Sequence, residues 1–194
     1  IAATRIPKGI PNFKYNIEIP SLESVKKNWD PQKWNPSKDL PLEKLTDAKS
    51  KKAVALNETE IEWIEAWNEF VVLMREKLGD KSLPGFPIWA DDWVLEKDLK
   101  IPRGTPDWKE NFLRKNSEFY TKHKVVLNKW LKKWNHLEHF PPSRRMFEWQ
   151  AQDTKTLWEA IMHFRPSGIR AKKATYVPAL VAITQTSIIG KQKR

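Results

Sequence analysis

The sequence contains no cysteine among its 194 residues, which excludes disulfide bonds and any thiolate nucleophile or ligand. Glycine is scarce, and its six residues are scattered, so no glycine-rich loop is available to cradle a nucleotide phosphate. No apolar run approaches the ~20 residues that span a bilayer, and no signal peptide precedes the chain. These absences predict a cytoplasmic protein without thiol chemistry or a nucleotide loop. The first residue is Ile1 and not methionine, which is typical of a piece of a longer protein.

Acidic residues are also absent from one end of the chain. No Asp or Glu follows Glu159, whereas seven Lys or Arg residues do. A second basic excess lies in residues 106–135, which hold eight basic and three acidic residues, while residues 1–105 hold 17 of each sign. The net charge of +11 is therefore concentrated in two segments, which indicates an anionic partner such as nucleic acid. A solvated surface is the alternative interpretation of the same charges.

Residues 163–194 place an apolar, β-branched run between two basic clusters. The run from Tyr176 to Ile189 is rich in Val, Ile and Thr, which favours a β-strand, and Gly190 ends it. The basic clusters lie in the loops on either side of this run. A strand between two basic loops would present the loop side chains to an anionic surface.

The segment Pro178 to Ala182 (Pro-Ala-Leu-Val-Ala), followed by Gly190 and a basic run, resembles the target-recognition region of the DNA (cytosine-5)-methyltransferases. In that family, Pro-Thr-Leu-Thr-Ala commonly precedes a short basic run that leads to a motif opening with Leu-Thr-Pro-Arg-Glu. The segment Ile1 to Arg5 is similar to the strand after the family's Gln-x-Arg-x-Arg motif. Ala179 departs from the pattern, because the family has at this position a threonine that contacts the DNA backbone.

The resemblance implies a parent enzyme that transfers a methyl group from S-adenosylmethionine to C5 of a flipped cytosine, after a cysteine thiolate attacks C6. The cysteine and the family's Glu-Asn-Val motif are missing here, so we expect catalysis and cofactor binding in a missing catalytic domain. This chain is then expected to bind no cofactor, to be inactive alone, and to recognise double-stranded DNA. The alternative is a Trp-rich protein-docking module whose basic face binds an acidic partner.

The candidate DNA-binding residues come mainly from the two basic clusters and the run between them. Arg and Gln are common readers of base edges, and Lys neutralises phosphates. Strand polarity is the alternative explanation for the three residues from Thr184 to Thr186, and a solvated loop for the lysines. Arg144 and Arg145 would clamp phosphates or else pair with Glu138 or Glu148. The full set is Arg144, Arg145, Arg165, Ser167, Arg170, Lys172, Lys173, Thr184, Gln185, Thr186, Lys191 and Lys193.

Local signals predict two long helices and several short elements. Asn57 and Glu60 fit a capping box, and Gly79 suits the end of a helix that starts at Asn57. A second helix is predicted from Pro106, capped by Thr105, to Asn135, with a basic outer face. We expect a short strand with a basic start within Ser143 to Gln150, and a short helix from Thr154 to about Met162.

These elements predict an α+β fold, in which a small β-containing recognition domain carries a large, mostly helical insertion. The expected parts are a strand and Pro-rich lead-in from the catalytic domain, a linker, the helical insertion and the basic strand-loop recognition segment: residues 1–20, 21–56, 57–160 and 161–194. The eleven tryptophans predict an aromatic core. His136 and His139 have metal-ligand spacing, but no third ligand is near, which argues against a zinc site.

Overall fold

The structure is a computed structural model that describes residues 47–79, 83–175 and 187–193. It confirms the predicted α+β class, with three helices and a five-stranded mixed sheet in these ranges. The expectations for residues 1–46, including the first strand, and for the run 176–186 lie outside the described residues. The elements are α3 (Ala48–Val54), α4 (Glu58–Leu78), β1 (Ile88–Trp89), α5 (Asp107–Lys133), β2 (Met146–Gln150), β3 (Ile161–Arg165), β4 (Gly168–Lys172) and β5 (Ser187–Ile189).

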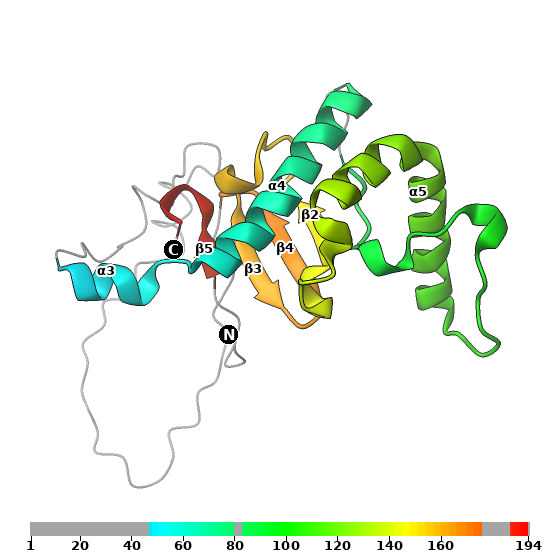
Figure 1. Ribbon diagram of the computed structural model, residues 1–194, viewed down its shortest axis with the longest axis horizontal. Helices are drawn as coiled ribbons and strands as arrows, with labels where there is room; N and C mark the ends of the chain where they lie inside the picture. Colours follow the sequence, from blue (N-terminus) through cyan, green and yellow to red (C-terminus); the bar gives the residue numbers. More distant parts are fainter. Residues whose placement is uncertain (1–46, 80–82, 176–186, 194) are drawn as a thin grey trace, which may run out of the picture.

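The sheet has the strand order β1-β2-β4-β3-β5. β2 and β4 run parallel, and the other three pairs are antiparallel. Figure 1 shows α4 lying across one face of this sheet, and α5 curving away beyond the β2 side. β3 and β4 form a tight hairpin whose turn contains Pro166 and Ser167, both exposed. The first basic cluster was expected in a loop, but Arg165 ends β3, and Arg170 and Lys172 lie in β4.

Helix α4 begins and ends as its sequence predicts. The side chain of Asn57 accepts a hydrogen bond from the Glu60 backbone, and the Glu60 carboxylate accepts one from the Asn57 backbone, which completes the capping box. Gly79 ends the helix with φ 61°, a left-handed conformation that glycine adopts without steric cost. The buried face of α4 comprises Ile64, Ala66, Trp67, Phe70, Val71 and Met74, and it packs into the core.

Tryptophan side chains connect α4 to the sheet and to α5. The Trp67 ring stacks on Phe147 of β2 with ring centroids 4.8 Å apart, and it contacts Trp130 of α5 at 5.2 Å. Each indole N–H has a backbone acceptor: Trp67 Nε1 donates to the Arg144 carbonyl oxygen, and Trp130 Nε1 to that of Ala66. These rings bury a large apolar area while their polar atoms stay hydrogen-bonded. The aromatic core predicted from the tryptophan content is confirmed for these residues.

Helix α5 confirms the second predicted helix, with two differences at its ends. Pro106, not Thr105, occupies the cap position, and the Thr105 hydroxyl donates to the Pro102 carbonyl oxygen instead. The helix ends at Lys133, after which Asn135 to Leu137 take positive φ angles. Its buried side includes His123, Leu127 and Trp130, and its outer side carries the expected basic residues.

Two local predictions are wrong. Residues 154–162 do not form a helix: a 3₁₀ turn at Leu157–Glu159 leads directly into strand β3. Residues 161–165 pair with both β4 and β5, so long-range ladder hydrogen bonds override the local helical signal. The segment from Asp47, expected to be an exposed linker, is exposed but contains the short helix α3. The short strand predicted within Ser143 to Gln150 is confirmed as β2, but it begins at Met146, after the two arginines.

One hydrophobic core contains residues from both sides of position 160. Trp67 and Trp130 belong to the part expected as a helical insertion, whereas Ile169 and Ala171 belong to the expected recognition segment. β2 also pairs directly with β4 across this division. The division of roles between residues 57–160 and 161–194 stays a prediction. The two parts nevertheless share one hydrophobic core and one sheet.

Gly168 starts β4 with φ 115°, and a side chain there would meet the backbone of β2. A Cβ atom would lie 2.6 Å from the Met146 carbonyl oxygen and 2.8 Å from the Met146 Cβ atom. We expect Gly168→Ala to destabilise the fold by about 2 kcal/mol or more, because both the backbone strain and the contact oppose it. The melting temperature of the variant should be lower by roughly 4 to 8 °C. Gly85→Ala is the control, since nothing lies within 4 Å of its added Cβ atom and its φ is ordinary; equal melting of the two variants would contradict the prediction.

Candidate nucleic-acid interface

One face of the sheet is apolar and packs into the core, while the other carries a row of polar side chains. In β2, β3 and β4, Phe147, Met162 and Ile169 belong to the core on the side of α4. The alternating residues form a row across the other face, because Glu148 is paired with Arg170, Arg170 with His163, and His163 with Ser187. Glu148 and His163 of this row are buried, whereas Arg170 is partly exposed. The row contains one of the predicted base readers, Arg170.

Glu148 is the centre of an ion-pair network on this polar face. Its Oε2 atom accepts from Arg165 Nη2 at 2.6 Å and from Arg170 Nε at 2.8 Å, and Gln150 donates to Oε1. The side chains of Glu148 and Arg165 are each 12% exposed, and that of Arg170 is 30% exposed. Two predicted base readers from adjacent strands are therefore held together by one carboxylate. The sequence analysis considered Glu148 only as a partner of Arg144 or Arg145.

The two adjacent arginines both bind groups within the protein. The Arg144 guanidinium lies over the rings of Trp63, at 5.2 Å, and Phe164, at 4.5 Å, and its Nη1 donates to the Arg165 carbonyl oxygen. Burial lowers the pKa of Arg144, an effect that the charge of Glu60 opposes. Arg144 therefore anchors the end of β3, and neither Glu138 nor Glu148 is its partner.

Arg145 also has several protein partners. Its Nε donates to the Phe140 carbonyl oxygen, its Nη2 to the Glu138 carbonyl oxygen at 2.8 Å, and its Nη1 lies 3.4 Å from the Asp91 carboxylate. The expected contact with residue 138 exists, but through the backbone and not the carboxylate. A phosphate clamp at Arg144 and Arg145 stays a prediction, and it would have to use donors beyond those that hold the fold.

Lysines from three separate segments line one open pocket of about 420 Å³, together with the carboxylates of Asp153 and Glu159. Lys173 follows β4, Lys191 follows β5, and Lys155 comes from the loop after β2. Lys173 donates to Asp153 at 2.9 Å, and this hydrogen bond is the main reason that the pKa of Asp153 lies below its usual value. The fold thus brings the predicted phosphate contacts Lys173 and Lys191 together. It adds Lys155, which the sequence analysis missed because it lies far from both in the sequence.

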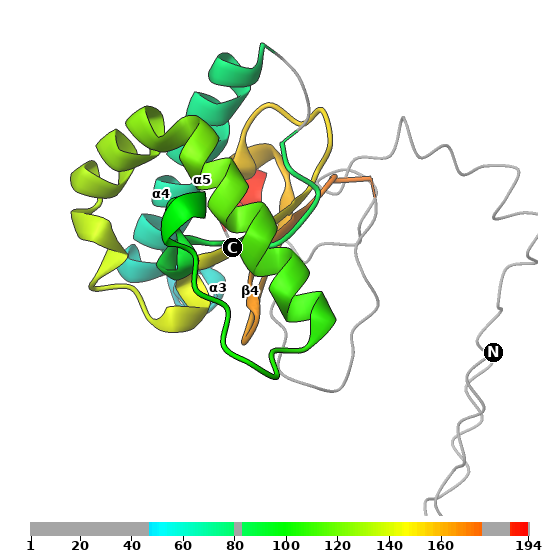
Figure 2. The ribbon, with the colours of Figure 1, turned by 90° about the vertical axis from the view of Figure 1, so that its right-hand side faces the viewer.

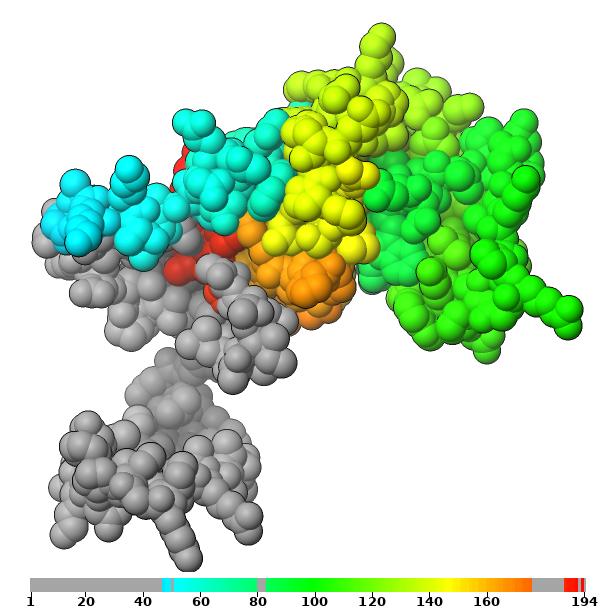
Figure 3. Space-filling model, turned by 60° about the horizontal axis from the view of Figure 1, so that its bottom comes forward, coloured from blue at the N-terminus to red at the C-terminus, as the bar shows by residue number. Residues whose placement is uncertain are grey.

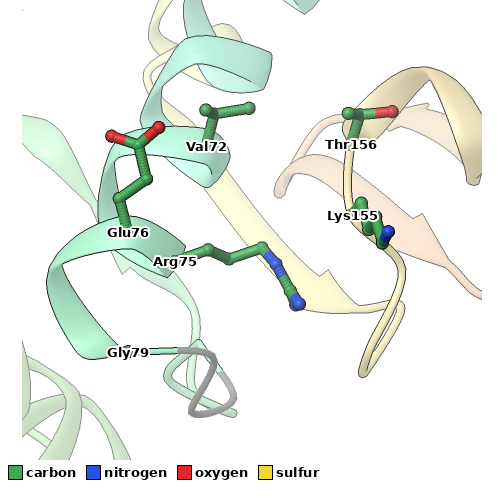
Figure 4. Close-up of a pocket in the computed structure, with 6 residues that line it drawn as sticks. All are labelled: Val72, Arg75, Glu76, Gly79, Lys155 and Thr156. Carbon is green, nitrogen blue, oxygen red and sulfur yellow. The ribbon is translucent and has the colours of Figure 1, made fainter.

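A neighbouring pocket of about 520 Å³ separates the end of α4 from the same loop. Arg75 extends from α4 into the space beside Lys155 and Thr156, while Glu76 points away from it (Figure 4). Lys155 therefore lies between two concave regions that contain both basic and acidic side chains. Both belong to the end of the sheet opposite the hairpin tip, since they are built around the loop after β2 and the end of β4.

The other predicted site residues are more dispersed. Ser167 is exposed at the hairpin tip, which Figure 3 shows in orange on the surface between α4 and the green part of the chain that contains α5. Lys172 is partly buried at the end of β4, and Lys193 lies over the Trp158 ring at 5.0 Å. Thr184, Gln185 and Thr186 lie outside the described residues.

The outer side of α5 is a second basic surface, at the opposite end of the molecule from η6 (Gly190–Gln192) in Figure 1. Lys133 pairs with Glu69 and Arg114 with Glu110. The remaining lysines on this side are exposed and have no acidic partner in the described ranges: Lys115, Lys122, Lys124, Lys129 and Lys132.

A metal site is not built from the described residues, which contain no group of three possible ligands. The His139 ring instead hydrogen-bonds to the Glu62 carboxylate at 3.0 Å. None of the helices within these ranges is both long and apolar enough to cross a membrane.

Sequence comparison relates the chain to a methyltransferase. It is 39% identical over 181 residues to the type II methyltransferase M.AluI of Cellulosimicrobium cellulans. The match covers 72% of this chain and 34% of that protein, so the chain spans about a third of its relative's length. No protein-family model matches the chain, and no solved structure matches it. The chain is thus a distant homologue of part of a type II methyltransferase.

His163 makes the polar row sensitive to pH. It is 4% exposed and its Nε2 has no hydrogen-bond partner; burial, aided by Lys172, Arg165 and Arg170, lowers its pKa below the usual 6.5. The unfolded chain then binds a proton more readily than the folded chain. We expect stability to fall as the pH drops below about 6.5, and His163→Gln to weaken this dependence. Melting temperatures of both proteins at pH 7.5 and 5.5 test this; an equal acid-induced shift in both would contradict it.

Proposed function

We propose that this chain is the DNA-recognition part of a DNA cytosine-5 methyltransferase of a restriction-modification system. In this proposal it corresponds to the target-recognition region, and it positions a duplex for a catalytic domain elsewhere in the parent enzyme. The observation that carries the proposal is the 39% identity to a third of a type II methyltransferase. The order from Pro178 to the basic run after Gly190 supports the cytosine-5 class and the recognition role.

The reaction itself is assigned to residues outside this chain. A cytosine-5 methyltransferase needs a cysteine thiolate to attack C6, and this sequence has no cysteine. The methyl donor, S-adenosylmethionine, carries a positively charged sulfonium group. The two open pockets described above combine cationic side chains with carboxylates, namely Arg75, Lys155, Lys173 and Lys191 with Glu76, Asp153 and Glu159, so their lining does not indicate a site for this cation. Because the nucleophile must lie in the catalytic domain, we place the cofactor site there as well.

The lysines and the arginines have different parts in the proposed recognition. Lys173, Lys191 and Lys155 converge on one open pocket, where a DNA phosphate would meet several charges at once. Lys172 and Lys193 flank this region and add to the phosphate contacts. Phosphate contacts position a protein on DNA without reading its sequence, whereas base contacts specify it. Base readout is assigned to Arg165, Arg170 and the Thr184 to Thr186 stretch.

The chain alone should transfer no methyl group to DNA. The purified 194-residue protein lacks the nucleophile, so incubation with duplex DNA and radiolabelled S-adenosylmethionine should give no label above background. Label recovered in C5-methylcytosine would show that the assignment of catalysis to another part of the enzyme is wrong.

The lysine pocket should account for much of the chain's affinity for duplex DNA. We expect weak binding, with Kd around ~10⁻⁵ M at physiological salt, because the other wall of the cleft is contributed by the catalytic domain. Replacing Lys155, Lys173 and Lys191 together by Ala should weaken binding of all sequences alike. The slope of log K against log salt should flatten by up to ~2.7, about 0.9 for each lost phosphate contact. Fluorescence anisotropy over a salt series measures both effects.

The matched control removes three charges from the outer side of α5, by replacing Lys122, Lys124 and Lys129 with Ala. Its binding and its salt slope should stay close to those of the unaltered chain. If the control loses affinity and the pocket variant does not, the DNA contact lies on α5. If the unaltered chain binds no duplex even at low salt, the DNA-recognition proposal fails, and docking of the basic face to an acidic protein becomes the better explanation.

A further inference from the structure

Glu148 restricts which edge of Arg170 can reach a ligand. A guanidinium group has two edges that offer a pair of parallel N–H donors to a planar acceptor, and one of them includes Nε. In this structure Arg170 Nε donates to Glu148 Oε2 at 2.8 Å. Its two terminal nitrogens have no partner among the described residues. The edge that includes Nε is therefore occupied, and the Nη1–Nη2 edge remains available.

The carboxylate that binds Arg170 is itself held by several contacts. Glu148 lies directly opposite Arg170 in the ladder between β2 and β4, and its second oxygen accepts from Gln150. Arg165 donates to the same Oε2 atom at 2.6 Å. A carboxylate that is held in this way on a sheet restrains the guanidinium that donates to it. Less conformational entropy is then lost when Arg170 binds a ligand.

Arg165 and Arg170 are not equivalent in this network. The Arg165 side chain is 12% exposed, and its Nε is buried without a partner. Its carbonyl oxygen is also tied to Arg144, which lies between the rings of Trp63 and Phe164. The Arg170 side chain is 30% exposed. Arg170 is therefore the accessible member of the pair, and Arg165 completes the support around Glu148.

We propose that Glu148 is a positioning residue that presents the Nη1–Nη2 edge of Arg170 as a reader of guanine in duplex DNA. This inference rests on the proposed DNA-recognition function and names the base that one residue of that surface reads. Guanine offers O6 and N7 as two acceptors in the major groove, and a bidentate arginine is the commonest specific partner of this pair. Adenine offers one donor and one acceptor there, and cytosine offers a donor, so neither matches an edge of two donors.

A phosphate would also accept from this edge, but it does not need the same geometry. The lysines at the other end of β4 already supply charges on flexible side chains, and a phosphate contact gains little from a fixed plane. A buried carboxylate beside the arginine would oppose an approaching phosphate, since both carry negative charge. The neutral acceptor edge of guanine meets no such repulsion. Glu148 therefore favours a base over a phosphate at Arg170.

The test begins with selection of preferred sequences from a pool of randomised duplexes, using the unaltered 194-residue chain. Each guanine of the selected site is then replaced by 7-deazaguanine, which lacks the N7 acceptor. At one guanine we expect this change to weaken binding by about tenfold in the unaltered chain. Arg170→Lys, which keeps the charge but loses the fork, should show no preference at that position and little response to the modified base.

Glu148→Gln separates positioning from a merely structural role. The change removes a negative charge, so binding to unrelated duplexes should become tighter, while discrimination at the same guanine should fall. A simple loss of structure would weaken both the binding to unrelated duplexes and the discrimination at this guanine. Lys191→Ala is the control, because it removes a charge from the lysine pocket and should leave the preferred sequence unchanged. Near-ultraviolet circular dichroism reports whether each variant keeps its aromatic core.

These experiments distinguish a failure of the guanine assignment from a failure of the proposed DNA-recognition function. If the unaltered chain selects a sequence and Arg170→Lys selects the same one, the guanine assignment is wrong and the recognition role stands. If Arg170→Lys weakens every duplex equally, Arg170 is a phosphate contact and the assignment is also wrong. If the unaltered chain binds no duplex, the proposed function fails and the inference falls with it. The Arg170→Lys and 7-deazaguanine results decide the question even if Glu148→Gln does not fold.

Discussion

The stacking of Trp67 on Phe147 is the contact on which the arrangement of the molecule depends. It joins α4 to β2 at a ring separation of 4.8 Å, and Trp130 brings α5 against the same indole. Three elements that are far apart in the sequence thus meet at one side chain. The Trp67 N–H also donates to the Arg144 carbonyl oxygen, so the core holds the segment that leads into β2. Burial of several aromatic rings contributes most of the stability here, and the hydrogen bonds fix the orientation.

A continuous set of contacts connects this core to the polar face of the sheet. Arg144 is fixed at its backbone by Trp67, and its guanidinium, between Trp63 and Phe164, holds the carbonyl oxygen of Arg165. Arg165 in turn binds Glu148, which binds Arg170. Each step is a direct ring contact or hydrogen bond, so the position of Arg170 depends on the packing of the core. A substitution at Arg144 would act on the interface without touching a ligand.

Local sequence signals predicted the parts of the fold that depend on neighbouring residues. The capping box of Asn57 and Glu60, the glycine that ends α4, and the length of α5 to within a turn could all be predicted, because each is fixed within a few positions. Strand β3 could not, since residues 161–165 become a strand only by pairing with β4 and β5.

The candidate site shows the same limit. Its basic residues are visible in the sequence, but Glu148 lies between two buried aromatics in β2 and gives no sign that two arginines from other strands converge on it. Lys155 was missed for a similar reason, because its proximity to Lys173 and Lys191 arises only from the fold. The sequence shows which residues are charged. Which of these charges are paired depends on the register between strands, which the sequence does not show.

The separation of arginine from lysine explains how a chain with a net charge of +11 can carry specific recognition. On and beside the sheet, Arg144, Arg145, Arg165 and Arg170 all donate to protein acceptors and are partly buried. The lysines of α5, by contrast, remain exposed. A planar, always-charged guanidinium tolerates burial among aromatic rings and carboxylates, while a strongly hydrated ammonium does not. Uniformly exposed charge would bind any polyanion. A guanidinium held by a carboxylate on a rigid sheet points its N–H donors in one direction. The orientation of these donors is what distinguishes one base edge from another.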